Sequence, residues 1–170
     1  MRILKIALLA TAASAALSTA TLAADLIMDP PEPSPIIDNS FNWDGVYLGS
    51  YLSGQSVPST YGVGVVIGAN ATSDAFLYGG ELELGWLSNS TWTVQADARL
   101  GVLVADNFAV YGFSGIGRNS TNGTFIPVGA GIEVGLSDNL SLKTEYQFNY
   151  DLTSSAQDAN VVKAGINWHF

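Results

Sequence analysis

The sequence predicts an all-β fold, an eight-stranded antiparallel transmembrane β-barrel, from three observations. Apolar and polar residues alternate with a period of two in eight successive segments, which is the periodicity of a β-strand. Beyond the N-terminal region, Gly and polar residues interrupt every apolar run, so no later segment predicts a membrane-spanning helix. The charged residues and most of the glycines of the eight segments lie on the face opposite the aliphatic residues.

The eight segments are each about 9–13 residues long, the length that a tilted strand needs to cross a bilayer. Residues that favour turns, such as Asp106-Asn107 and Asp138-Asn139, separate them. An even number of strands places both ends of a barrel on one side of the membrane. The predicted strands are 44–52, 61–70, 76–86, 92–104, 108–117, 126–136, 140–150 and 161–170.

The first four strands each present one apolar face. These faces are Val46, Leu48 and Leu52; Tyr61, Val63, Val65, Ile67 and Ala69; Phe76, Tyr78, Leu82, Leu84 and Trp86; and Trp92, Val94, Ala96, Ala98, Leu100, Val102 and Val104. The fifth strand has the weakest pattern, because Phe108, Val110 and Ile116 lie on one face but Tyr111 and Phe113 lie on the other. The last three strands recover the alternation, and the final one carries Val162, Ala164, Ile166, Trp168 and Phe170.

The face opposite the aliphatic residues predicts what fills the barrel. A soluble sandwich or lipocalin-like barrel, the alternative fold, would place its charged face in water and would not require so many small residues there. An eight-stranded barrel has a cramped interior, in which glycine leaves room for large polar side chains of neighbouring strands. The predicted lumenal charge network is Glu81, Glu83, Asp97, Arg99, Glu133, Lys143, Glu145 and Lys163. Pairing Leu136 with Leu140 across the turn at 137–139 sets Glu133 opposite Lys143 and predicts a salt bridge between them.

The N-terminal region predicts export. Residues 1–23 have the charged, apolar and small-residue parts of a signal peptide, and their apolar run is shorter than the ~20 residues of a spanning helix. Residues 24–42 are rich in Pro and acidic residues, which predicts an extended periplasmic tail before a barrel at 43–170. Export leaves four of the six basic residues against fifteen acidic ones, so the composition excludes a nucleic-acid-binding surface.

Aromatic residues near the strand ends predict the girdles of a membrane barrel. The expected girdle residues are Trp43, Trp86, Trp92, Tyr146, Tyr150 and Trp168. The last strand ends on Phe170, and outer-membrane barrels commonly end on an aromatic residue. We therefore expect Trp168 and Phe170 to act as an assembly signal.

Four motifs resemble a known family. The opening segment WDGVYLGSYL (43–52) is similar to the W-x-G-x-Y-x-G first strand of the small alphaproteobacterial OmpA-like, or porin-family, outer-membrane proteins. Residues 98–112, 129–146 and 163–170 resemble the later hairpins and the closing strand of that family. The resemblance implies an eight-stranded outer-membrane barrel that the barrel-assembly machinery inserts. It does not fix the biological role.

No catalytic, cofactor-binding or metal site is expected. The single histidine, His169, is expected to face inward beside Asn167 as a hydrogen-bonding plug. The presumed outer loops 53–60, 88–91, 118–124 and 151–159 contain no histidine, so they cannot assemble a catalytic triad. Glu81, Glu83 and Asp97 form a possible cation site, but the nearby Arg99 favours charge neutralisation.

The sequence favours a structural, non-enzymatic protein with a side-chain-filled lumen that contributes to envelope integrity. A small-solute porin is the first alternative, and eight strands argue against it because side chains just fill such an interior. An adhesin or host-contact protein is the second alternative. The expected partners are outer-membrane lipid, lipopolysaccharide and the barrel-assembly machinery, with no nucleic acid and with the protein as a monomer.

Overall fold

The structure is a computed structural model that describes residues 41–121, 123–153 and 158–170. The predicted signal peptide, 1–23, and residues 24–40 of the predicted tail lie outside the described residues. No helix among the described residues is long and apolar enough to cross a membrane.

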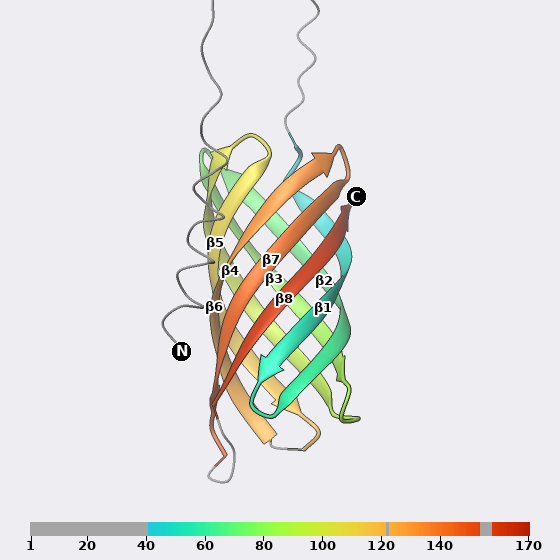
Figure 1. Cartoon of the computed structure of the whole chain (residues 1–170). Helices are drawn as coiled ribbons and strands as arrows, with labels where there is room; N and C mark the ends of the chain where they lie inside the picture. Colours follow the sequence, from blue (N-terminus) through green and yellow to red (C-terminus); the bar gives the residue numbers. More distant parts are fainter. Residues whose placement is uncertain (1–40, 122, 154–157) are drawn as a thin grey trace, which may run out of the picture. The chain divides into compact units, whose positions relative to one another are not determined.

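Eight antiparallel strands close into one barrel, in which each strand pairs with its sequence neighbours and the last pairs with the first (Figure 1). Closure satisfies the backbone hydrogen-bonding groups that an open sheet edge would expose. The predicted fold class is therefore confirmed. The strands are β1 (Gly45–Ser56), β2 (Ser59–Ser73), β3 (Phe76–Leu87), β4 (Trp92–Ala105), β5 (Phe108–Asn119), β6 (Gly123–Ser137), β7 (Leu140–Asp151) and β8 (Ala159–His169).

The two ends of the barrel differ in the length of their connections. At the end where β1 begins and β8 ends, here called the turn end, the connections are the two-residue turns 74–75, 106–107 and 138–139. The opposite end, here called the loop end, carries the connections 57–58, 88–91, 120–122 and 152–158. Short turns are typical of the periplasmic end of a membrane barrel and longer connections of the outer end.

The predicted outer loops 53–60 and 118–124 are longer than the connections observed. Arg118 and Asn119 of the second loop belong to β5, and its last two residues belong to β6. Residues 53–60 were expected to form an outer loop, but β1 continues to Ser56 and β2 starts at Ser59, so only Val57 and Pro58 connect them. The ladder continues because Ser53, Gly54 and Gln55 still pair with β2. Beyond the apolar band, both faces of a strand can be polar. The alternation of apolar and polar residues is then lost, although the strand still pairs with its neighbour through the backbone.

The alternation of side chains is inverted relative to a soluble protein. On β8, Val162 and Ile166 are about half exposed (51% and 48%), whereas Lys163 and Asn167 between them are buried (4% and 0%). Most charged and aliphatic residues of the other strands follow the same pattern, and the exceptions include the exposed Arg118 and the buried Val66 and Leu77. The aliphatic face therefore points outward, where only lipid can cover it, and the polar face fills the lumen.

Aromatic rings in the lumen lie over glycines of the neighbouring strand. Tyr111 and Phe113, which weakened the predicted pattern of the fifth strand, are buried and directly opposite Gly131 and Gly129 of β6. A Cβ atom on Gly131 would lie 2.7 Å from the Tyr111 ring, so only glycine leaves room for it. Five such aromatic–glycine pairs occur on the described strands, namely Tyr47–Gly68, Tyr51–Gly64, Tyr111–Gly131, Phe113–Gly129 and Phe125–Gly117. The lumenal glycines thus accommodate rings in addition to the polar side chains that we expected, such as Asn167 beside Gly49 and Asn70 beside Gly79.

Candidate functional site in the barrel lumen

The eight residues of the predicted charge network all point into the lumen and are buried. Seven of them lie on β3, β4, β7 and β8, and Glu133 lies on β6. The side-chain period of two places them on one face of each strand, and closure of the barrel brings those faces together.

Arg99 is the centre of the network. Its guanidinium binds Glu81 of β3 at 2.7 Å and Glu133 of β6 at 2.8 Å, and it also donates to the Tyr47 hydroxyl at 2.5 Å. The cation lies 3.9 Å from the centroid of the Tyr111 ring. Two carboxylates and an aromatic face therefore compensate one buried guanidinium.

Lys143 joins the same network from β7. Its ammonium nitrogen lies 2.9 Å from Oε1 and 3.1 Å from Oε2 of Glu81, and 3.4 Å from Oε1 of Glu145. Glu145 also accepts a hydrogen bond of 2.8 Å from the Tyr111 hydroxyl. Glu81 consequently binds both Arg99 and Lys143, which come from β4 and β7.

The predicted salt bridge between Glu133 and Lys143 is wrong, although the register that suggested it is right. The two residues are directly opposite each other on β6 and β7. Glu133 instead binds Arg99 and accepts a hydrogen bond from Ser141 at 2.5 Å, while Lys143 reaches across to Glu81. The turn also differs, because a bulge pairs Ser137 rather than Leu136 with Leu140. Register identifies neighbours along the sheet, but barrel closure decides which walls face each other.

The remaining charges lie toward the loop end. Lys163 of β8 binds Glu83 of β3. Asp97 has no basic partner among the described residues and accepts a hydrogen bond of 2.5 Å from Gln95. Glu81 and Glu83 each bind a basic side chain, so the possible cation site is neutralised at two of its three members. Within the described ranges, no group of three His, Cys, Asp or Glu residues is placed to hold a metal ion.

An aromatic cluster closes the turn end. The His169 ring stacks on Tyr47 with centroids 5.1 Å apart, and its Nε2 lies 3.1 Å from the Ser141 hydroxyl. Phe41 contacts His169 edge-on at 4.8 Å. The indole nitrogen of Trp43 donates to the Asp106 carbonyl at 3.0 Å, which ties the segment before β1 to the β4–β5 turn. His169 thus lies inside the barrel, where the sequence placed it.

Trp43 is not a girdle residue, which corrects the prediction. It is only 3% exposed and packs beside Phe41, a residue that we assigned to the tail. Gly45, the first residue of β1, has φ +114°, a conformation that favours glycine and that separates the direction of Trp43 from the alternation of the strand. The other expected girdle residues are exposed on the outer face, as are Trp168 and Phe170.

A small cavity remains at the loop-end side of the lumen. It has a volume of about 30 Å³, room for two or three water molecules. Glu83, Lys163, Gln95 and Gln147 line it, and the two glutamines exchange hydrogen bonds of 3.1 Å.

Several residues of the lumenal site were missed as partners. Tyr47, Tyr111 and Ser141 each bond to a charged residue of the network. Their inward parity on the strands was visible in the sequence. Their partners were not visible. Glu81 and Glu145 lie on strands that do not pair with those of Tyr47 and Tyr111, and Glu133 is shared between Ser141 and Arg99.

Comparisons with known proteins agree with this architecture. No family model matches the chain. The chain is 27% identical to the 25 kDa outer-membrane immunogenic protein of Brucella abortus over 213 aligned positions, which cover both chains completely. It is 29% identical to the 22 kDa outer membrane protein of Rhizobium leguminosarum over 168 positions, which cover 76% of this chain and 79% of the relative.

Solved structures share the fold. The N-terminal β-barrel domain of Pseudomonas aeruginosa OprF has a TM-score of 0.59 and 16% identity, covering 74% of this chain and 96% of that domain. The outer membrane enzyme PagL has a TM-score of 0.60 and 7% identity, covering 73% of this chain and 99% of PagL. Such low identities show the fold alone. Together with the sequence relatives, which are named as outer-membrane proteins, they show that the chain is an eight-stranded β-barrel of the outer membrane that is similar to the Brucella and Rhizobium proteins.

Proposed function

We propose that the protein is a structural, non-enzymatic component of the outer membrane, a monomer whose filled barrel contributes to envelope integrity. The observation that carries this proposal is the filling of the lumen from one end to the other. The aromatic cluster around His169 closes the turn end, the Arg99 network occupies the middle, and the Gln95–Gln147 pair lies toward the loop end. The closed barrel also leaves no unpaired strand edge for a second copy to extend.

A porin role has less support. A cavity of about 30 Å³ holds water but no solute, and the salt bridges of Arg99 and Lys143 with Glu81 join different walls of the lumen. Purified protein in a planar bilayer should therefore show no stable conductance steps of the size that general porins give. Reproducible, long-lived openings would favour the porin over the structural role.

An enzymatic role was tested against the one Ser–His–Glu group among the described residues. Ser141, His169 and Glu133 lie together, but the hydroxyl and the carboxylate both face Nε2 of the imidazole, at 3.1 and 3.6 Å. In a catalytic triad the acid and the nucleophile bind opposite ring nitrogens. Here Nδ1 has no partner and all three side chains are buried away from a substrate. The geometry supports a role for these three side chains in filling the lumen and not in nucleophilic catalysis.

A host-contact role also has weaker support, because the described connections 57–58 and 88–91 at the loop end are short. A deletion strain separates the possibilities. We expect it to be more sensitive to detergent and to release more vesicles, with recovery when the wild-type gene is restored. Normal envelope behaviour combined with a loss of cell adhesion would contradict the structural role.

A further inference from the structure

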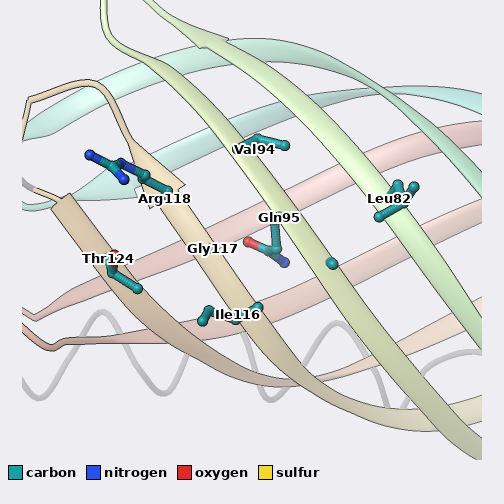
Figure 2. Close-up of a pocket in the computed structure, with 8 residues that line it drawn as sticks. Leu82, Val94, Gln95, Ile116, Gly117, Arg118 and Thr124 are labelled. Atoms are coloured by element: carbon teal, nitrogen blue, oxygen red, sulfur yellow. The ribbon is translucent and has the colours of Figure 1, made fainter.

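A shallow groove lies on the outer face of the barrel across β4 and β5, near the loop end. Leu82, Val94 and Ile116 form its sides, and all three are 43–58% exposed. The small side chain of Ala96 forms the floor, since it pairs with Leu82 on one side and with Ile116 on the other. Figure 2 shows Arg118 and Thr124 at the loop end of this groove, with Leu82 at the opposite end. The groove is thus apolar along its length and basic at its outer limit.

Arg118 is the only exposed charged side chain on the described strands. The other strand cations, Arg99, Lys143 and Lys163, are buried in the lumen. None of the described acidic residues forms an ion pair with Arg118, whereas each lumenal cation binds at least one carboxylate. This outward guanidinium on a lipid-facing strand therefore has no anionic partner among the residues that the structure describes.

The depth of Arg118 in the membrane follows from its neighbours. It pairs with Val94 and with Thr124, and the next contact toward the loop end joins Trp92 to Ser120. Trp92 in turn pairs with Trp86, and both indoles are exposed at this level. Exposed tryptophans mark the interface between hydrocarbon and headgroups, so Arg118 lies at headgroup depth.

We propose that this groove is a binding site for lipopolysaccharide, with a lipid A acyl chain along Val94, Ala96 and Ile116 and a lipid A phosphate on Arg118. The outer leaflet of the outer membrane consists largely of this glycolipid, and longer connections such as 88–91 at the loop end are typical of the side that faces that leaflet. A guanidinium binds phosphate through paired hydrogen bonds, which are stronger at an interface of low polarity than in water. Thr124 places a hydroxyl beside the same position.

A second outer groove supplies the matched control. It lies on β1, β2, β7 and β8, where Leu52, Val63, Leu142, Ala164 and Ile166 line it. Its apolar character is similar, but no charged side chain lines it. Both grooves can hold an acyl chain, and only the first offers an anion site.

The test measures binding of bisphosphorylated lipid A to the full-length mature protein, refolded in detergent, by native mass spectrometry. We expect R118Q to weaken binding about ten-fold, the effect of losing one charge-assisted contact. A96F should weaken it by filling the groove, whereas A164F should bind like the wild type. Dephosphorylated lipid A should bind the wild type as weakly as the intact lipid binds R118Q.

Each variant is first checked for the folded form by its gel mobility without heating. Equal affinity of R118Q and the wild type would overturn the proposal, as would equal binding of the two lipid A forms. Loss of binding in A164F but not in A96F would place the site in the other groove and would also overturn it. The R118K variant keeps the charge but loses the paired hydrogen bonds, so its affinity should lie between those of the wild type and R118Q.

Discussion

Gln95 of β4 and Gln147 of β7 exchange two hydrogen bonds of 3.1 Å, one in each direction, across the lumen. The strands that carry them share no backbone pairing. Gln95 also donates to Asp97 and Gln147 to Asn149, each at 2.5 Å. A row of hydrogen-bonded side chains, three amides and one carboxylate, therefore connects two strands that do not pair through their backbones.

Replacing Gln147 by Leu should lower the free energy of unfolding by about 1–3 kcal/mol, because the amide of Gln95 then loses its buried partner. Urea-induced unfolding in lipid vesicles measures this change. The matched control is Thr144→Val on the same strand, which is exposed on the outer face and should have little effect. Equal losses in both variants would show that the pair across the lumen has no special role.

The partner of Lys143 is the subject of the second prediction. Lys143→Met and Glu81→Gln should be non-additive in a double-mutant cycle, because the two side chains are hydrogen-bonded at 2.9 and 3.1 Å. Each single variant leaves its partner with one other counter-ion, Arg99 for Glu81 and Glu145 for Lys143, so each should cost less than the ~3–5 kcal/mol of a buried charge left alone. The cycle of Lys143 with Glu133, its direct neighbour across the strands, should show a much smaller coupling. A larger coupling for Glu133 would contradict the observed network.

The aromatic–glycine pairs give a prediction with an internal control. Gly131→Ala should destabilise the barrel by about 1–3 kcal/mol, since the new Cβ atom would lie 2.7 Å from the ring of Tyr111. Gly112→Ala on the adjacent strand should be tolerated, because its Cβ atom would meet nothing closer than 3.7 Å. Refolding yield and urea midpoints of the two variants test the difference. Similar destabilisation by both would mean that strand glycine is needed for backbone reasons instead.

The sequence predicted the strands because the alternation of apolar and polar residues survives wherever lipid covers one face. It predicted the inward position of all eight charged residues for the same reason. It did not predict that Lys143 meets Glu81, because that contact crosses the lumen between strands far apart in the chain. Trp43 was wrongly assigned to the aromatic girdle. The alternation of apolar and polar residues does not reveal the unusual backbone conformation at Gly45, which follows Trp43 closely.

Closure of the barrel predicts a difference in gel mobility. The folded protein should resist SDS at room temperature and migrate faster unheated than after boiling, because the closed ladder leaves no strand edge for detergent to attack. Identical mobility before and after heating would contradict a closed barrel.

Phe170 should matter more in the cell than in the test tube. Its side chain is 73% exposed and points outward, so its deletion removes little packing and should cost modest stability. We propose that Phe170 is part of an assembly signal, so we expect the deletion to reduce outer-membrane levels far more than it reduces refolding in detergent. Immunoblots of membrane fractions and refolding yields provide the two measurements. Comparable, severe losses in both would show that Phe170 acts through stability alone.

The five aromatic–glycine pairs lie on only two hairpins, β1–β2 and β5–β6, which face each other in the closed barrel. Seven of the eight charges occupy the other two hairpins, β3–β4 and β7–β8. The rings that fill the volume therefore lie on one opposed pair of hairpins and most of the charge on the other, and the hydroxyls of Tyr47 and Tyr111 join the two sets. An engineer who recoded the polarity of β3–β4 and β7–β8 would keep the diameter, which strand number and stagger set, but would have to supply new partners for these two hydroxyls.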